Sequence, residues 1–203
     1  MGPACQGSGC HDNEKVDFNG VLKPHIEATR HRMGEQEVVI LPQDTTEIDL
    51  TRPGQRVSGA GPLDGGPRRG VFLHLLHAFT ADGAALGTVH ATVLARADAP
   101  PPKKSHRAAR RRRTPIEDKD SCRWIEGFCQ ARAEAQRAPR TEFVSVADSE
   151  ADIYELLVEA EDRPANLHWI VRACQNRALA GTESQGAEAA EGDAPFATCA
   201  SRS

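Results

Sequence analysis

The alternation of apolar and polar positions predicts a series of short strands and helices. Apolar runs bounded by turn residues predict strands at 38–43, 71–79, 84–94, 142–147 and 167–173. Ala81, Asp82 and Gly83 separate the second run from the third, and glycine adopts positive φ without strain. The second and third runs are therefore expected to form a hairpin.

Helical spacing of apolar residues predicts three helices. A short basic helix is expected over 20–33, with Pro24 in its first turn. Thr114 is expected to cap a second helix that continues to about Arg137, because a proline and a glutamate follow it at positions that favour a helix start. A third helix is expected over 149–160, where apolar residues recur at helical intervals.

The resulting order is three strands, a helix, a strand, a second helix and a last strand. Strands joined by a crossover helix run parallel, whereas strands joined by a tight turn run antiparallel. The expected fold class is therefore α/β, with a mixed sheet flanked by helices. This order of elements matches a ribonuclease-H-like fold.

Length and composition favour one folded core with less regular ends. The 203 residues are 39% hydrophobic, enough for one ordinary core. Glycine and proline predict a loop at 52–67, and proline followed by arginine predicts a surface linker at 98–113. After residue 180 the chain turns to small and acidic residues, which predicts disorder. We expect an N-terminal region over 1–33, a core over 34–179 and a low-complexity tail over 180–203.

Charge is distributed unevenly along the chain. A net charge of −4 would argue against a nucleic-acid partner if the charge were spread evenly. The segment 103–113, however, has no acidic residue and contains Lys103, Lys104, Arg107, Arg110, Arg111, Arg112 and Arg113. This run is expected either to contact DNA phosphates or to form a solvated loop.

Cysteine and histidine positions do not indicate a metal site of their own. Six cysteines with irregular spacing favour a reducing cytoplasm over a disulfide framework. His74 and His77 face opposite sides of an expected strand, so they are not expected to share an ion. No apolar run approaches the roughly 18 residues that cross a bilayer, and no membrane partner is expected.

Six short motifs occur in a recognisable order. Two of them are acidic and follow apolar runs, namely QDTT at 43–46 and DSEADI at 148–153. The other four are RRGVFLH at 68–74, LGTVH at 86–90, EDKDS with Trp124 at 117–124, and HWIVRA at 168–173. Over roughly residues 12–179 the chain thus resembles the bacterial cut-and-paste DDE transposases of the IS-four group, to which the Tn-five transposase belongs.

The resemblance implies the same ribonuclease-H-like fold and a two-metal site. Asp44 and Asp148 would be the first two catalytic carboxylates and would hold Mg²⁺ or Mn²⁺. Because each follows an apolar run, both are expected at strand ends. Either could instead be a simple cap, and Ser149 with Asp152 is expected to form a capping box for the helix over 149–160.

The resemblance also implies contacts with DNA. Arg172 matches a family arginine that contacts DNA phosphate, although a solvated strand-end arginine would give the same pattern. The partners implied are transposon-end and target DNA, with a second copy or an intact transposase subunit as a protein partner. The implied location is the bacterial cytoplasm, in association with the nucleoid.

The chain departs from the family pattern at the third carboxylate. In the family this glutamate belongs to a Tyr-Arg-Glu-Lys signature, but the only tyrosine is Tyr154, and Leu157 stands where the arginine would be. Glu183, Glu188 and Glu191 lie in the tail without the surrounding pattern. The fold is therefore expected to be incomplete at its C-terminus, and the chain to be a transposase fragment truncated at both ends.

Three functions remain open from the sequence. The first is a transposase fragment that binds transposon ends and is inactive alone, because metal-dependent cleavage and strand transfer would need the missing carboxylate. The second is a noncatalytic DNA-binding or interaction remnant of a transposase. The third is a stand-alone ribonuclease-H-like nuclease, which would need a further acid between Asp44 and Asp148.

Overall fold

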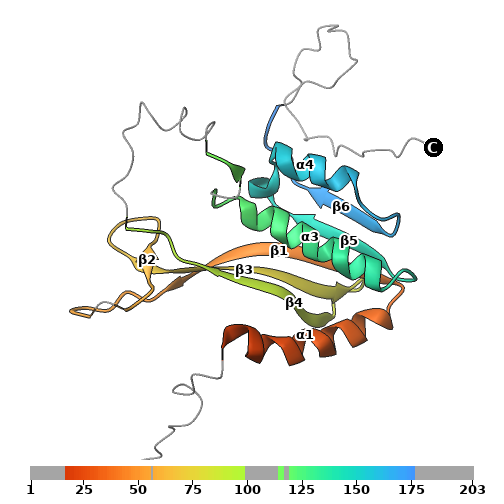
Figure 1. Ribbon diagram of the computed structural model, residues 1–203, viewed down its shortest axis with the longest axis horizontal. Helices are drawn as coiled ribbons and strands as arrows, with labels where there is room; N and C mark the ends of the chain where they lie inside the picture. The colour runs from red at the N-terminus through yellow and green to blue at the C-terminus, as the bar shows by residue number, and fades with distance from the viewer. Residues whose placement is uncertain (1–16, 56, 99–113, 117–118, 177–203) are drawn as a thin grey trace, which may run out of the picture.

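The computed structural model describes residues 17–55, 57–98, 114–116 and 119–176. They form a mixed α/β fold in which helices flank a six-stranded mixed sheet (Figure 1). The elements, in chain order, are α1 (Phe18–Gly34), β1 (Val38–Asp49), β2 (Gly61–Pro62), β3 (Arg69–Thr80), β4 (Ala85–Leu94), α3 (Cys122–Arg137), β5 (Glu142–Ala147), the 3₁₀ helix η2 (Ser149–Ala151), α4 (Tyr154–Glu161) and β6 (Leu167–Val171).

The sheet is antiparallel on one side of β1 and parallel on the other. Its strands lie in the order β4, β3, β1, β5, β6, and the short β2 pairs with the start of β3. β3 is antiparallel to both β1 and β4, whereas β1, β5 and β6 are parallel to one another. Gly83, with φ of 90°, lies in the turn between β3 and β4. The expected hairpin and the expected parallel crossovers are confirmed.

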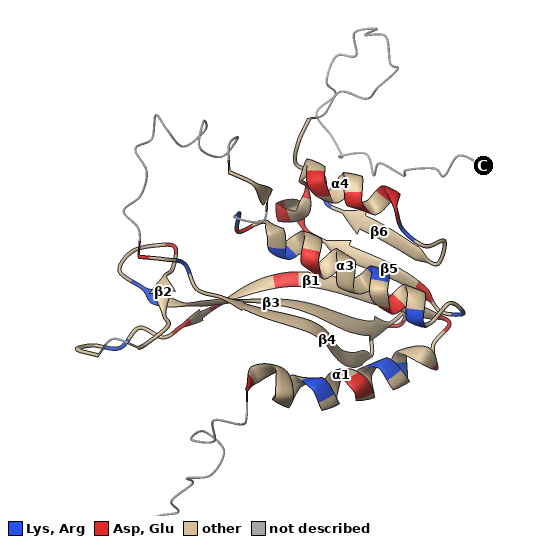
Figure 2. Cartoon of the chain, in the orientation of Figure 1, with Lys and Arg blue, Asp and Glu red and all other residues tan. Residues whose placement is uncertain are grey.

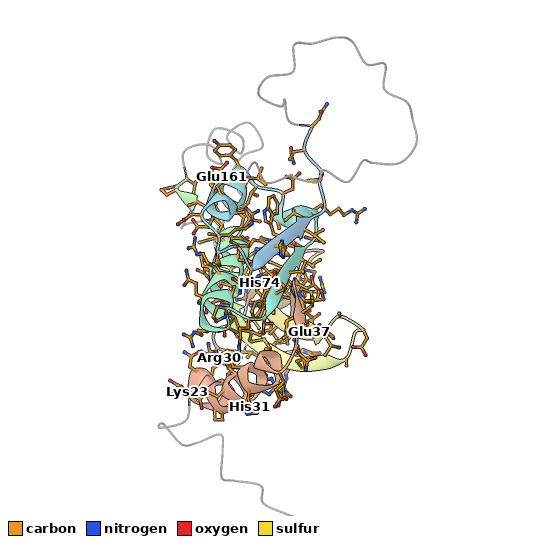
Figure 3. The ribbon with its side chains drawn as sticks, turned by 90° about the vertical axis from the view of Figure 1, so that its right-hand side faces the viewer. Lys23, Arg30, His31, Glu37, His74 and Glu161 are labelled. Carbon is orange, nitrogen blue, oxygen red and sulfur yellow. The ribbon has the colours of Figure 1, made fainter. Side chains whose placement is uncertain are left out.

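Strand alternation gives the sheet one buried face and one partly exposed face. Along β1, Val39, Leu41 and Gln43 are buried, while the residues between them are only half-buried. The helix α3 packs on the buried face, where Trp124 and Phe128 are almost fully enclosed. Figure 3 shows α3 and α4 on the same side of the strands.

A glycine on α3 allows this helix to approach the sheet closely. A Cβ atom added at Gly127 would lie 2.2 Å from the side-chain oxygen of Gln43 and 3.4 Å from the His74 ring. Real Cβ atoms do not approach other atoms to within 3.0 Å. Gly127 therefore brings the α3 backbone into contact with polar side chains of β1 and β3.

The helix α1 covers the free edge of β4. Arg32 donates through Nε to the carbonyl oxygen of Leu86 at 2.7 Å, and the backbone N–H of Thr88 donates to His25 Nε2 at 2.9 Å. An edge strand with unpaired backbone groups invites pairing with another chain, and these side chains satisfy two such groups. The N-terminal helix therefore protects the sheet as well as packing on it.

An ion pair joins α1 to α3. Arg30 contacts Glu134 at 2.6 Å, and the Glu134 side chain is only 2% exposed. A buried carboxylate needs a partner of this kind because desolvation of an unpaired charge is costly. Figure 2 shows residues of both signs on α1 and α3, with only acidic residues on α4.

Several expected boundaries are wrong. The second helix begins at Cys122 rather than at Thr114, because turn bonds such as Cys122 N to Lys119 O occupy the preceding segment. The first helix begins at Phe18, with Asp17 as its N-cap, so Pro24 lies in the helix interior rather than in its first turn.

The first strand is also longer than expected. It continues to Asp49 because β3 pairs with it along that whole length, so Asp44 lies within a strand and not at its end. The expected loop at 52–67 contains β2 and is otherwise built of turns and irregular backbone in the described residues. The expected linker, with Arg110 to Arg113, and the expected tail lie outside the described residues, apart from Asp98. Within the described residues, no helix is long and apolar enough to cross a membrane.

A test of the close helix-to-sheet contact is Gly127→Ala. Alanine gains about 1 kcal/mol of helix propensity over glycine, but overpacking of a core costs about 1–3 kcal/mol. Since Gln43 must move and give up its buried hydrogen bonds, we expect a net loss in the free energy of unfolding of about 1 kcal/mol or more, measured by urea denaturation. Gly34→Ala in α1 is the control, because a Cβ there would meet no atom within 4 Å. Equal effects of the two substitutions would contradict a close contact at Gly127.

Candidate metal site at the carboxyl end of the parallel strands

The register between β1 and β5 brings the two predicted aspartates together. The parallel ladder pairs Val38 with Glu142 and ends at Pro42 paired with Val146. The ladder stops there, and the same offset carried two residues beyond it would place Asp44 across from Asp148. Paired strands lie about 4.8 Å apart, so this offset would bring the two carboxylates to neighbouring backbone positions.

The same row contains Arg172. In the ladder between β5 and β6, Ala147 pairs with Val171, and the backbone N–H of Arg172 donates to the carbonyl oxygen of Ala147 at 3.1 Å. Arg172 directly follows the last residue of β6, as Asp148 directly follows the last residue of β5. Both registers, carried past the ends of their ladders, would place Asp44, Asp148 and Arg172 in one row. All three are exposed.

Strand alternation places the row on the face away from α3. Gln43 is buried and faces α3, so its neighbour Asp44 projects to the other face. The backbone of Asp148 is still extended, with φ of −80° and ψ of −168°, so the alternation along β5 continues to it. The carboxyl ends of parallel strands are where ligands bind in open α/β sheets.

Asp148 has a structural role besides any role in metal binding. It is the N-cap of η2, and its Oδ1 accepts a hydrogen bond from the backbone N–H of Glu150 at 2.8 Å. The capping alternative considered for Asp148 is thus observed. An ionised carboxylate has about four lone-pair positions, so one capping bond leaves capacity for a cation.

The expected capping box is wrong. The helix α4 begins at Tyr154, preceded by η2, and no side chain caps it. Asp152 instead accepts at Oδ2 from the backbone N–H groups of Cys174 and Gln175, each at 2.7 Å. The Asp152 carboxylate therefore accepts hydrogen bonds from the chain after β6, and not from the start of a helix as the capping box predicts.

Asp44 has neighbours from two directions. Its Oδ1 accepts from the backbone N–H of Thr45 at 2.7 Å. His77 lies close enough for the Asp44 charge to raise its pKa, but burial has the larger effect and the net pKa of His77 is lowered. His77 also bonds to Thr88, whereas His74 contacts different partners, so the two histidines do not converge on one site.

Carboxylate oxygens such as those of Asp44 and Asp148 are typical ligands of Mg²⁺ and Mn²⁺. Mg²⁺ keeps several waters and is commonly held by one or two carboxylates together with substrate phosphates. Within the part of the chain that the structure describes, no group of three or more histidines, cysteines or acids could hold an ion. Tyr154 is 69% exposed on α4, and Glu183, Glu188 and Glu191 lie outside the described residues.

A chain of buried polar side chains runs beneath the row, on the α3 side. Arg123 Nε lies 2.9 Å from Thr45 Oγ1, which lies 2.9 Å from His74 Nδ1. His74 Nε2 lies 3.4 Å from the oxygen of Gln43, whose amide nitrogen lies 3.3 Å from Ser145 Oγ. Every member can donate to the next if neutral His74 holds its proton on Nε2.

Burial keeps His74 neutral. Its side chain is 0% exposed, and its ring packs edge-on against Trp124 with 4.7 Å between centroids. Desolvation, with smaller contributions from Arg123 and His90, lowers the pKa of His74 from its ordinary 6.5 to about 4. A second proton would place a donor on Nδ1, and Thr45 would then lose the acceptor for its own hydroxyl proton.

This buried chain was not predicted from the sequence. In the sequence, Gln43 and Thr45 stand out only as parts of the QDTT motif, and His74 only as one of two histidines that are not expected to share an ion. The period of two along a strand was the available signal, because it places Gln43 and Thr45 on the face opposite Asp44. Arg123 had no local signal, because its partners are remote in sequence.

A pocket among the described residues lies elsewhere. It has a volume of about 480 Å³ and lies beside the start of β3, with Arg69, Arg96 and Asp98 among its lining residues. Arg69 pairs with Asp98, and Arg96 pairs with Asp64 and Asp120. Because these carboxylates offset both guanidinium charges, the pocket is not an anion site.

Comparison of the sequence with protein-family models found no match, and comparison with curated proteins found none.

The buried state of His74 predicts acid sensitivity. Since its pKa is lower in the folded chain than in the unfolded chain, the unfolded chain binds the proton first as pH falls. The free energy of unfolding should therefore fall between about pH 6.5 and pH 4, by about 3 kcal/mol from this group. The measurement is urea denaturation across this range, comparing the parent chain with His74→Gln, which has no titrating ring.

The control is His31→Gln, because the His31 side chain is 79% exposed. The difference between the parent and His74→Gln should shrink as pH falls, and His31→Gln should follow the parent at every pH. A difference that stays constant from pH 7 to pH 4 would show that His74 does not titrate in this way.

Proposed function

We propose that this chain is a DDE-transposase-like module with a ribonuclease-H-like fold that binds divalent metal ions and DNA phosphates. The single observation that supports it most is the register of the parallel strands, which, carried just past the ends of the two parallel ladders, lines up Asp44, Asp148 and Arg172. The resemblance assigned carboxylate and phosphate-binding roles to these three residues. The first and the last of them, Asp44 and Arg172, are 172 − 44 = 128 positions apart in the chain.

The strand order supports the same assignment. Three antiparallel strands come first, and two crossover helices then add two strands parallel to β1, giving the order β4, β3, β1, β5, β6. This is the order expected of a ribonuclease-H-like sheet. In that arrangement the first carboxylate belongs to the central strand, and Asp44 lies on β1 at the centre of this sheet.

The chemistry follows from the donor set. Asp44 and Asp148 would hold Mg²⁺ or Mn²⁺, which activates an attacking oxygen and stabilises the leaving oxygen of a phosphodiester. Arg172 would hold a phosphate of the DNA by charge-assisted hydrogen bonds. The reaction class is cleavage at transposon ends, followed by attack of the freed 3′-hydroxyl on target DNA. A homodimer or an intact transposase subunit would be the protein partner.

The described residues favour weak or absent cleavage by this chain alone. They bring two carboxylates together, whereas the proposed chemistry uses three. An ion held by too few ligands is misplaced, and a misplacement of about 1 Å can reduce a rate about a hundredfold.

A second candidate function is that of a noncatalytic DNA-binding or interaction module. It is favoured by the capping bond of Asp148, which gives this residue a use in folding without any metal. The two functions differ in whether Mn²⁺ binds at the row and whether DNA is cut.

We expect Mn²⁺ to raise the melting temperature of the parent chain. An ion that binds only the folded state stabilises it by about 1.4 kcal/mol at ten times Kd, which is a few degrees in melting temperature. Asp44→Asn and Asp148→Asn should each abolish most of this shift in differential scanning fluorimetry. Asparagine caps helices about as well as aspartate, so Asp148→Asn removes the charge and keeps the cap.

The control for the metal response is Asp82→Asn. Asp82 lies in the turn between β3 and β4, where it bonds to Thr80. This variant should respond to Mn²⁺ as the parent does. A response that survives in both Asp44→Asn and Asp148→Asn would place the ion elsewhere and remove the main support for the proposal.

We expect sequence-independent DNA binding that weakens with salt. Each phosphate neutralised on duplex DNA contributes about 0.9 to the slope of log affinity against log salt. Arg172→Ala should therefore reduce this slope by about 0.9 in fluorescence anisotropy titrations, and alanine at Arg110, Arg111, Arg112 and Arg113 together should reduce it further. Arg140→Ala is the control, because Arg140 is exposed and precedes β5 at the opposite end of the strand from the row.

The same preparation tests cleavage. Mn²⁺ with transposon-end DNA should give no nicking above background. Strong nicking that disappears in Asp148→Asn would mean that a third ligand is supplied, and would favour the enzyme over the noncatalytic module.

A further inference from the structure

Arg123 joins the two segments that contain the row aspartates. It lies in the first turn of α3 and is only 13% exposed. Its Nε donates to Thr45 Oγ1 at 2.9 Å, and its Nη2 donates to Glu150 Oε2 at 2.7 Å. Its Nη1 donates to the backbone oxygen of Asp120, so all three guanidinium nitrogens have partners.

Both partners are neighbours of the aspartates. Thr45 follows Asp44 directly on β1, and its backbone N–H donates to the Asp44 carboxylate. The backbone N–H of Glu150 donates to the Asp148 carboxylate. The Arg123 guanidinium therefore connects the segment that contains Asp44 to the segment that contains Asp148. The connection runs through Thr45 on one side and Glu150 on the other.

The link from Arg123 to β1 is itself held in place. Thr45 Oγ1 is also 2.9 Å from Nδ1 of the buried His74, which fixes the hydroxyl between two partners. The parallel ladder ends at Pro42 and Val146, so beyond it the spacing between β1 and the chain after β5 is no longer set by backbone pairing. Arg123 bridges the two segments beyond the end of the parallel ladder, where β1 is paired only with β3.

We propose that Arg123 is a positioning residue that sets the spacing of Asp44 and Asp148 for a shared divalent cation. The proposal rests on the proposed metal site and adds to it a residue that contacts neither the metal nor the DNA. Outer partners of metal ligands contribute about 10–100-fold to metal affinity in proteins. A planar fork suits the task because its nitrogens bond to Thr45 and Glu150 at once, whereas a lysine ammonium acts as a point charge.

Charge and geometry make opposite predictions for this residue. Arg123 is a cation near a proposed cation site, so Coulomb repulsion alone predicts that its removal tightens Mn²⁺ binding. If Arg123 sets the spacing, its removal weakens Mn²⁺ binding despite the lost repulsion. The sign of the change therefore separates the two effects.

The experiment measures Mn²⁺ affinity by electron paramagnetic resonance, which detects free Mn²⁺, together with the melting temperature of each variant without metal. The variants are Arg123→Met and Arg123→Lys. The control is Arg132→Met on the same helix, because Arg132 is 23% exposed and pairs with Glu159 on α4, away from the row. It tests for the general effect of losing a half-buried arginine from α3.

We expect Arg123→Met to weaken Mn²⁺ binding by about tenfold or more. Arg123→Lys should recover little of the loss although it keeps the charge, and Arg132→Met should bind as the parent does. Unchanged or tighter binding in a folded Arg123→Met protein would overturn the proposal. If the parent itself shows no Mn²⁺ binding that depends on Asp44, the metal site fails and the positioning role fails with it.

A double-mutant cycle gives an independent readout if Arg123→Met also lowers the melting temperature. Glu150→Ala removes the acceptor of one of the two links and should weaken Mn²⁺ binding in the parent background. In the Arg123→Met background, the same substitution should have little further effect, because the link is already broken. Additive losses would mean that Arg123 and Glu150 act separately, which would contradict a shared positioning role.

Discussion

The parallel pairing of β1 with β5 is the constraint on which the rest of this structure depends. β1 is shared by two ladders, one antiparallel with β3 and one parallel with β5. A slip of one residue in the parallel ladder would set Asp44 opposite Ala147 or Ser149 and would turn its partner to the other face. The observed registers, carried past the ends of the two ladders, instead line up Asp44 with Asp148 and Asp148 with Arg172.

The register is held by packing on the face away from the row. Phe143 and Leu41 are fully buried there. A shift of either strand by one residue would turn its buried side chain to the other face of the sheet. The polar chain from Arg123 to Ser145 lies on the same face, and every link in it is given a donor and an acceptor when His74 is neutral. A buried polar group without partners would cost several kcal/mol, so this chain specifies one arrangement of β1, β3, β5 and α3.

The two faces of the sheet thus have different tasks in the proposed function. The α3 face fixes the strands, and the opposite face presents two carboxylates and a guanidinium at the edge where parallel strands end. Asp148 takes part in both, since it caps η2 and belongs to the row. Arg123 lies on the α3 side and, by its hydrogen bonds to Thr45 and Glu150, connects α3 to the two segments that contain Asp44 and Asp148.

The sequence by itself determined five of the strands, the β3–β4 hairpin and the parallel sense of the strands joined by crossover helices, but not β2, the full length of β1 or the pairing of β1 with β3. The features it determined follow from apolar periodicity and from the length of each connection, which are local properties of the chain. Tertiary structure decided the starts of the helices. The signals at Thr114 and Ser149 were sound for isolated helices, but turn bonds at Cys122 and the donors of Cys174 and Gln175 took precedence.

Tertiary structure also decided the surroundings of the candidate site. Sequence motifs named Asp44, Asp148 and Arg172, but only the two ladders put them in one row. Arg123 and His74 gained their roles from partners between 27 and 78 positions away, which no periodicity can reveal. The sequence pattern predicts which face of a strand or helix a side chain lies on. Its contact partner on another element is determined only when the two elements pack together.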